Sequence, residues 1–226
     1  MSGAFVLGPM LLVGGGGGGG GAPTNAQVLA GLLEEPFALS TWTDTEADGA
    51  VIAVAAGAAV ATIPDGVASC AAYSTRPWSA GEGSLDFRAR LTIAGTAEAD
   101  CITYLVVLFG SQWLFFRCRG DGRVEAKHNF GGDTSLGIVT GRPINGTTHV
   151  RIRRDNSRVT MSYGTSADAV TDPAEDGWTV IYDDFVSAIA TRTPTGIRVQ
   201  AATEGGDLAA ETTVTWSDGD LRSGRV

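Results

Sequence analysis

The chain has 226 residues, of which 43% are hydrophobic and 18% are charged, and it carries a formal net charge of −9. This composition excludes wholesale disorder and allows one large all-β domain or two small domains. An acidic chain is also a poor match for nucleic acid or for an anionic membrane surface, because both attract basic proteins. We therefore expect neither a nucleic-acid partner nor membrane insertion.

The first residues form an apolar stretch that is followed by eight consecutive glycines, Gly14 to Gly21. The large apolar residues of the stretch are Phe5, Val6, Leu7, Met10, Leu11, Leu12 and Val13. The stretch lacks a basic start and a small-residue cleavage site, so a standard signal peptide is not expected. It is also too short to span a bilayer.

Ordering octaglycine costs more backbone entropy than ordering any other segment of that length. Burying about four to six large apolar side chains in a partner would contribute about 6–18 kcal/mol before that cost is subtracted. An arm of this kind makes thermodynamic sense only as an anchor. We therefore expect residues 1–24 to be an extended glycine-rich arm that docks into another protein.

The segment that follows the arm is the one stretch with helical spacing. Val28, Leu29, Leu32 and Leu33 would share one helical face, and Pro36 would end the helix. We expect residues 25–36 to form a short helix or a linker, and residues 37–226 to form the folded domain.

From Phe37 onward the sequence predicts β-strands. Apolar and polar residues alternate in SLDFRARLTI (84–93), HVRIRRD (149–155), RVTMSYG (158–164) and GIRVQAA (196–202). A period of two is typical of half-buried antiparallel strands. The apolar runs YLVVLFG (104–110) and WLFFRCR (113–119) favour strands that are covered on both faces. Turns are predicted at RGDG (119–122), NG (145–146) and RDNS (154–157). About a dozen short strands indicate a sandwich or a barrel.

The segment THVRIRRDNSRVTMSYG (148–164), followed by DGW (176–178), resembles a hairpin of the concanavalin A-like lectin/glucanase jelly roll and its laminin-G-like relatives. The closing segment (196–221) is similar to the last two strands of that family. The resemblance covers about residues 37–221 and implies an all-β, concanavalin A-like antiparallel β-sandwich, with Trp178 and Trp216 in the core. The insertion ADAVTDPAE (167–175) departs from the family pattern.

The arm and the lectin-like domain together resemble a structural protein of a tailed bacteriophage, of the minor tail or fibre type. This implies a non-enzymatic virion protein that is assembled in the host cytoplasm. Its partners would be other virion proteins, joined as a homo-oligomer (a trimer by analogy), and the lectin-like sandwich would be displayed for contact with a protein or with a host surface glycan. The alternatives are a free carbohydrate-binding lectin-like module and a glucanase-type hydrolase. The closely spaced carboxylates that such a hydrolase needs do not occur, so no catalytic residue is assigned.

A sugar site needs an exposed aromatic plate and a few polar groups, because the apolar face of a sugar ring stacks on an aromatic ring. Trp78 lies in a predicted loop and is the best exposed candidate, with Arg76 beside it. The outward-facing arginines of the alternating strands are Arg88, Arg90, Arg151 and Arg153. We interpret them as a solvated sheet face rather than as a site for an anionic glycan.

No cofactor is predicted, although a structural calcium ion is left open. Asp155 and Asn156 lie in a hairpin turn, where backbone geometry alone favours them. The three cysteines, Cys70, Cys101 and Cys118, are an odd number without metal-type spacing, so we expect reduced thiols. Cys101 and Cys118 lie nearly symmetrically about a turn near Gly110, which leaves a contact between them open.

Overall fold

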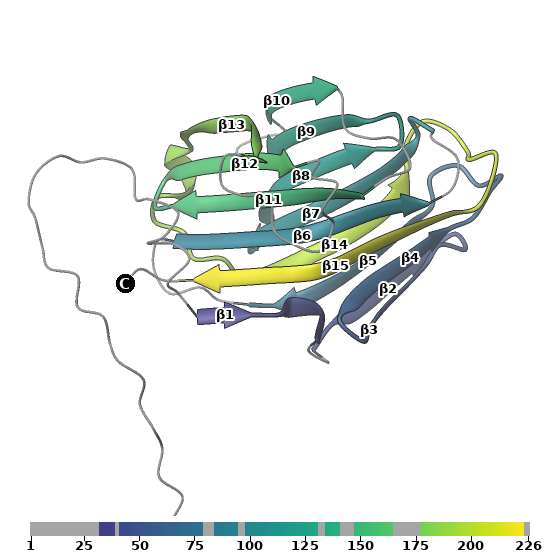
Figure 1. Cartoon of the computed structure of the whole chain (residues 1–226), viewed down its shortest axis with the longest axis horizontal. Coiled ribbons are helices and arrows are strands. Elements are labelled where there is room, and N and C mark those ends of the chain that lie inside the picture. Colours follow the sequence, from purple (N-terminus) through teal and green to yellow (C-terminus); the bar gives the residue numbers. More distant parts are fainter. Residues whose placement is uncertain are drawn as a thin grey trace, which may run out of the picture.

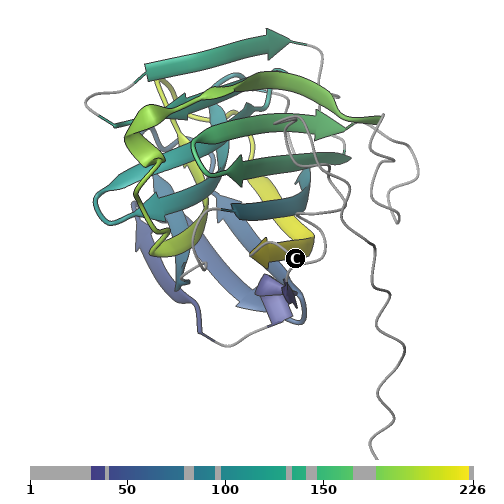
Figure 2. The same cartoon turned by 90° about the vertical axis from the view of Figure 1, so that its left-hand side faces the viewer.

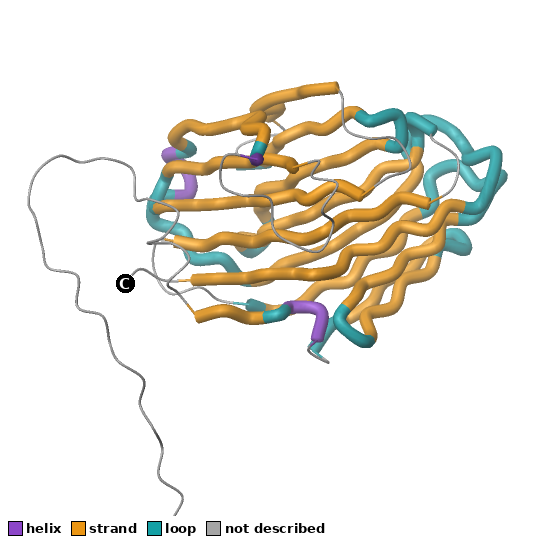
Figure 3. The backbone as a smooth tube through the Cα atoms, in the orientation of Figure 1, coloured by secondary structure: helices purple, strands orange, loops and turns teal. Residues whose placement is uncertain are grey.

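The computed structural model describes residues 32–38, 41–78, 84–94, 98–130, 134–140, 147–164 and 177–223. Within these ranges the chain forms fifteen β-strands and two short 3₁₀ turns, η1 (Pro36–Ala38) and η3 (Ser187–Ile189). The strands build two stacked antiparallel sheets (Figures 1 and 3). The all-β sandwich expected from the sequence is therefore confirmed. The arm, residues 1–24, lies outside the described residues.

The first sheet, sheet A, has eight strands and contains both described ends of the chain. Its strand order is β13 (Thr179–Phe185), β12 (Arg158–Gly164), β11 (Thr147–Asp155), β6 (Ser84–Ala94), β15 (Thr212–Ser223), β4 (Ala58–Ile63) and β3 (Val51–Ala55). The short strand β1 (Leu32–Glu34) pairs with the end of β15. All pairs are antiparallel.

The second sheet, sheet B, has seven strands, and it forms the second layer in the side view of Figure 2. Its strand order is β10 (Thr134–Thr140), β9 (Arg123–His128), β8 (Gln112–Arg119), β7 (Cys101–Phe109), β14 (Gly196–Thr203), β5 (Ala71–Pro77) and β2 (Thr43–Ala47). The hairpins of β7–β8, β8–β9 and β11–β12 are formed by consecutive strands. Gly110 turns the first of them with a φ of +69°, a conformation that favours glycine. The turns expected at RGDG and RDNS are confirmed, and NG (145–146) lies outside the described residues.

The core lies between the two sheets and follows the alternation in the sequence. Phe87, Leu91 and Ile93 of β6 face it, as do Val150 and Ile152 of β11. Trp216 is fully buried in this core, as expected. The three cysteines are buried thiols at one end of it. Because Cys118 pairs with Thr103, Cys101 and Cys118 are diagonal neighbours on the inner face.

The expected helix is wrong for the described part of residues 25–36. Leu32–Glu34 is strand β1, in register with Leu221–Ser223 of β15. Phe37 in the following turn is buried, stacks on Trp42 at 5.6 Å, and covers Gly219, where a Cβ would lie only 2.7 Å from the Phe37 ring. Pairing with a distant strand therefore overrides the local helical spacing, and the sandwich begins before Phe37.

The outer face of sheet A is a solvated arginine face only in part: Arg90 and Arg153 reach solvent, but Arg88 and Arg151 do not. Arg88 and Arg151 are only 5% and 3% exposed. Arg151 donates to the buried Asp86, with 2.6 Å between Nη2 and Oδ2, and its guanidinium lies 5.4 Å from the Trp178 ring. The ion pair makes the burial of both charges tolerable. Trp178 is half-buried beside this arginine. It is not part of the core, so the core position expected for Trp178 is wrong.

Candidate functional site

Three aromatic side chains form a platform on the outer face of sheet B. Trp113 and Phe115 alternate along β8 and stack with 4.2 Å between ring centroids. Tyr104 of the adjacent strand β7 meets Phe115 edge to face at 5.2 Å. Phe115 is buried but does not belong to the core between the sheets, whereas Trp113 and Tyr104 are half-buried. We call Tyr104, Trp113 and Phe115 the aromatic platform.

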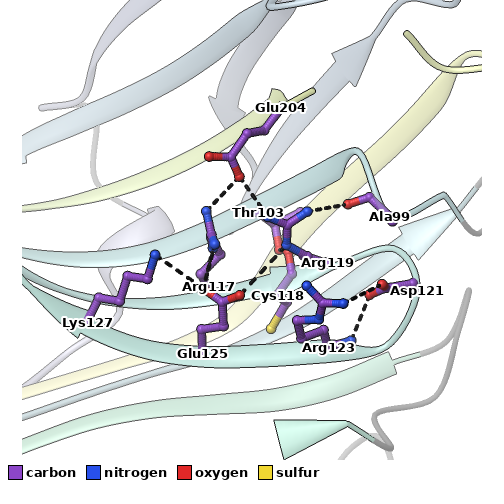
Figure 4. Close-up of polar contacts among 10 residues, drawn as sticks. All are labelled: Ala99, Thr103, Arg117, Cys118, Arg119, Asp121, Arg123, Glu125, Lys127 and Glu204. Atoms are coloured by element: carbon purple, nitrogen blue, oxygen red, sulfur yellow. Dashed lines mark hydrogen bonds and ion pairs between the residues drawn. The ribbon is translucent and has the colours of Figure 1, made fainter. Parts of the chain in front are cut away.

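A charge network adjoins the platform on β8, β9 and the segment that follows β14 (Figure 4). It consists of Arg117, Arg119, Glu125, Lys127 and Glu204. Arg117 donates through Nε to Glu125 Oε2 at 2.9 Å and through Nη1 to Glu204 Oε2 at 2.7 Å. The network contains three cations and two carboxylates, and each carboxylate contacts more than one cation.

The remaining contacts show how the network reaches the surface. Arg119 Nη2 donates to Glu204 Oε2 at 2.9 Å, and Lys127 Nζ lies 3.5 Å from Glu125 Oε2. The Glu125 side chain is 4% exposed, whereas that of Glu204 is 52% exposed. Buried charge-assisted hydrogen bonds therefore hold the arginines in place, while Glu204 and Lys127 present polar atoms to solvent.

Burial and hydrogen bonding shift the pKa values of Tyr104 and Arg117, which join the aromatic platform to the charge network. Burial raises the pKa of the Tyr104 hydroxyl, so this side chain stays neutral and keeps its proton for hydrogen bonding. Burial alone would lower the pKa of the Arg117 guanidinium, but the hydrogen bond with Tyr104 and the nearby Glu125 carboxylate raise it. Arg117 is therefore a permanently charged support for the platform.

A second aromatic group lies across β14 from the platform. The Arg198 guanidinium stacks 4.2 Å from the centroid of Tyr73 on β5, and its Nε donates to Thr75 Oγ1 at 3.0 Å. Gln200 lies in register with Tyr73 on one side and with Tyr104 on the other. Polar and aromatic side chains thus follow one another across five strands, from Tyr73 to Glu125, over about 19 Å at the usual strand spacing.

The residues proposed from the sequence as a sugar site are not on this face. Trp78 is 8% exposed and packs with the core, and its backbone amide, just after the end of β5, donates to the Thr195 carbonyl at 3.2 Å. Arg76 is also buried, in register with the core residue Ile197, and donates to Thr41 Oγ1 at 3.1 Å. The expected exposure of Trp78 is therefore wrong. Ligand contact by Trp78 or Arg76 stays a prediction.

The outer face of sheet B does not follow from the apolar run WLFFRCR, because such a run favours a strand that is covered on both faces. A signal was present, since Trp113, Phe115 and Arg117 alternate and must share one face of a strand. Glu125 and Lys127 alternate in the same way on the next strand. The register that joins them to Tyr73 and Arg198 could not be obtained from spacing alone.

The described residues offer no dense cluster of metal-ligating side chains. No group of three or more His, Cys, Asp or Glu side chains among them is arranged to hold an ion. Asp155 accepts a hydrogen bond from the Ser84 hydroxyl at 3.2 Å, and Asn156 adopts the positive φ of a turn residue. Both residues serve the hairpin turn. The two of them do not provide the set of oxygen ligands that a calcium ion needs. No helix in the described part of the chain is long and apolar enough to cross a bilayer.

No family model and no curated protein sequence matches the chain. Its structure, by contrast, is similar to solved lectin and carbohydrate-binding domains. The calcium- and Man3GlcNAc-bound exoplasmic/lumenal domain of VIP36 is 13% identical, with a TM-score of 0.55 over 84% of this chain and 87% of that one. The carbohydrate-binding module CBM66 of Bacillus subtilis is 10% identical, with a TM-score of 0.53 over 81% of this chain and 96% of that one.

A third similar structure comes from a bacteriophage. The CBM2 module of the evolved Dit protein of Lactobacillus casei BL23 phage J-1 is 11% identical, with a TM-score of 0.59 over 83% of this chain and 92% of that one. At such identities the likeness concerns the fold. The described part of the chain is a concanavalin A-like jelly roll, as the sequence resemblance implied.

Proposed function

We propose that the protein is a non-enzymatic, lectin-like carbohydrate-binding module whose ligand lies on the outer face of sheet B. The observation that carries this proposal is the aromatic platform, of which Trp113 and Tyr104 are partly exposed, with the charge network beside it. The similarity to lectin and carbohydrate-binding domains supports it. This corrects the order of the sequence-based hypotheses, in which the lectin-like module was the alternative.

The chemistry of the face suits a sugar. Trp113 provides a ring on which the apolar face of a pyranose can stack, and Phe115, stacked against it along β8, holds that ring in place. Glu204, Lys127 and Gln200 supply acceptors and donors for sugar hydroxyls at the rim. The surface extends across several strands, so the ligand is an oligosaccharide rather than a single sugar.

The test is a printed glycan array probed with the full-length chain, followed by calorimetric titration of the strongest binder. Trp113→Ala is expected to weaken binding about tenfold or more, as is typical for removal of an aromatic anchor. Phe185→Ala is the matched control, because it truncates a 66% exposed aromatic residue on sheet A. Absence of saccharide binding, or equal losses in both variants, would contradict the proposal.

A second, more specific role is favoured by the likeness to a phage Dit module and by the composition of the arm. In it, the module belongs to a tailed-bacteriophage virion as a minor tail or fibre-type protein assembled in the host cytoplasm. Residues 1–24 dock into other virion proteins, the chain forms a homo-oligomer such as a trimer, and the jelly roll is displayed toward a host surface glycan. Calcium has no part in this proposal.

Deletion of residues 1–24 tests the arm. The sandwich begins with β1 at Leu32, so the shortened chain is expected to fold and to keep its saccharide binding. It is expected to disappear from purified particles when it replaces the full-length protein. Normal incorporation of the shortened chain would contradict the anchoring role and would leave the carbohydrate-binding role untouched.

A further inference from the structure

We infer that the ligand of the outer face of sheet B is an acidic oligosaccharide that crosses the strands between Arg198 and Lys127. This inference rests on the proposed carbohydrate-binding function and specifies its ligand class. It starts from one straight row of side chains in sheet B. Arg198 pairs with Val106, Val106 with Phe115, and Phe115 with Lys127.

The row has a cation at each end and an apolar centre. The four residues lie on the neighbouring strands β14, β7, β8 and β9, so about 14 Å separates the backbones of the two cationic residues. Val106 and Phe115 between them are 5% and 8% exposed and do not belong to the core between the sheets. Trp113 and Tyr104 flank Phe115 on either side. Since Val106 and Phe115 are buried, the apolar surface open to a ligand is that of Trp113 and Tyr104, and an elongated ligand with apolar faces and negative groups matches this arrangement.

Arg198 is the more informative of the two cations. It is half-buried, stacks on Tyr73 and donates to the Thr75 hydroxyl. No carboxylate of the described residues forms an ion pair with it, and burial lowers its pKa. A partly desolvated cation without a countercharge is costly, and a carboxylate of a ligand would offset that cost. The guanidinium can donate two parallel hydrogen bonds to such a group.

Lys127 closes the row at the other end. Its ammonium group lies 3.5 Å from Glu125, but Glu125 is already bound by Arg117, and the Lys127 side chain is 23% exposed. An ammonium has three donors, so capacity for a ligand oxygen remains. Lys127 is also the only lysine among the 226 residues.

The local charge balance points the same way. The network holds three cations against two carboxylates, and Arg123 at its edge is matched by Asp121 at 3.9 Å. With Arg198, these outer-face residues carry an excess of two positive charges in a chain whose formal net charge is −9. A locally positive face attracts anionic ligands, even on a protein whose net charge is negative.

The test uses alginate, pectate and hyaluronate oligosaccharides, each beside its carboxyl-reduced neutral form, titrated into the full-length chain. At least one acidic form is expected to bind about tenfold more tightly than its neutral form, and its affinity should fall as salt rises. Arg198→Gln and Lys127→Gln should each weaken the acidic form about tenfold and change the neutral form less than about twofold. Arg158→Gln, which removes an exposed cation from sheet A, is the matched control and should change neither.

Two outcomes separate this inference from the function on which it rests. Binding of neutral saccharides that depends on Trp113 but not on Arg198 or Lys127 would overturn the acidic ligand and leave the carbohydrate-binding role standing. Absence of any saccharide binding would overturn both.

The single lysine provides an independent readout. A bound acidic oligosaccharide should protect Lys127 from acylation by an amine-reactive reagent, as measured by mass spectrometry, while labelling of the α-amino group serves as the internal reference. Lys127→Arg should keep the affinity, which distinguishes loss of charge from loss of fold. Unchanged labelling of Lys127 in the saturated complex would contradict the inference.

Discussion

The outer faces of the two sheets both carry arginines, but they balance these charges in different ways. On sheet A, Arg151 pairs with the buried Asp86, and Arg158 pairs with Asp183 at the exposed edge. On sheet B, three cations share two carboxylates beside an aromatic platform, and Arg198 stacks on a tyrosine instead. The buried pair of sheet A stabilises the fold, whereas the shared charges beside the aromatic rings of sheet B form the surface that we propose as the ligand site.

The largest loss of stability is expected when the buried ion pair of sheet A, Arg151 with Asp86, is broken. Asp86→Ala leaves the Arg151 guanidinium buried without its carboxylate, so the free energy of unfolding should fall by about 3–5 kcal/mol. Urea unfolding followed by tryptophan fluorescence measures this change. Asp86→Asn keeps an oxygen acceptor and should cost less, which provides a folded variant if the alanine variant does not accumulate. A loss below about 1 kcal/mol would mean that this face does not depend on the pair.

Removing one charged side chain from the charge network of sheet B should cost less stability than removing Asp86 from sheet A. Arg117→Met removes the central cation, but Lys127 and Arg119 remain near Glu125, so we expect a loss of about 1–3 kcal/mol in the same unfolding measurement. Saccharide binding should weaken as well, because Arg117 supports Tyr104. If Arg117→Met costs more stability than Asp86→Ala, the proposed contrast between the two faces is wrong.

The smallest effect is expected at the exposed pair on the edge of sheet A. The hydrogen bond from Arg158 holds the pKa of Asp183 below its ordinary value of 3.8. A depressed folded-state pKa means that the pair stabilises the protein above about pH 4 and that this contribution is lost as the pH falls through the folded value. In the Asp183→Asn variant the loss should be absent, and the difference should stay below about 1 kcal/mol because the pair is exposed. Unfolding curves at several acidic pH values measure it. A larger difference would contradict this prediction, because it would mean that the exposed pair contributes substantially to stability.

The architecture could be predicted because it is encoded locally. The alternation in SLDFRARLTI and HVRIRRD assigns each side chain to one face of a strand, and the turn residues at RGDG and RDNS set the hairpins. These features depend only on near neighbours along the chain. They are sufficient to indicate stacked antiparallel sheets.

The site could not be predicted, because it depends on register between distant segments. Arg198 and Lys127 share a row only through the pairing of four strands, and Trp78 is buried through a bond to Thr195. Leu32–Glu34 becomes a strand because β15 supplies a partner. In each case a contact with a distant part of the chain determines where the residue lies. The spacing of residues in the sequence does not predict that contact.

The most direct test of the central claim is an NMR titration of the full-length, ¹⁵N-labelled chain with the strongest saccharide from the array. The chain has five tryptophans, so each indole N–H provides a separate probe. We predict that the Trp113 indole and the backbone amides of Tyr104, Phe115 and Lys127 shift, while the buried Trp216 indole and the amides of Val60 and Phe185 on sheet A stay in place. Shifts confined to sheet A, with Trp113 unchanged, would contradict a ligand site on the outer face of sheet B.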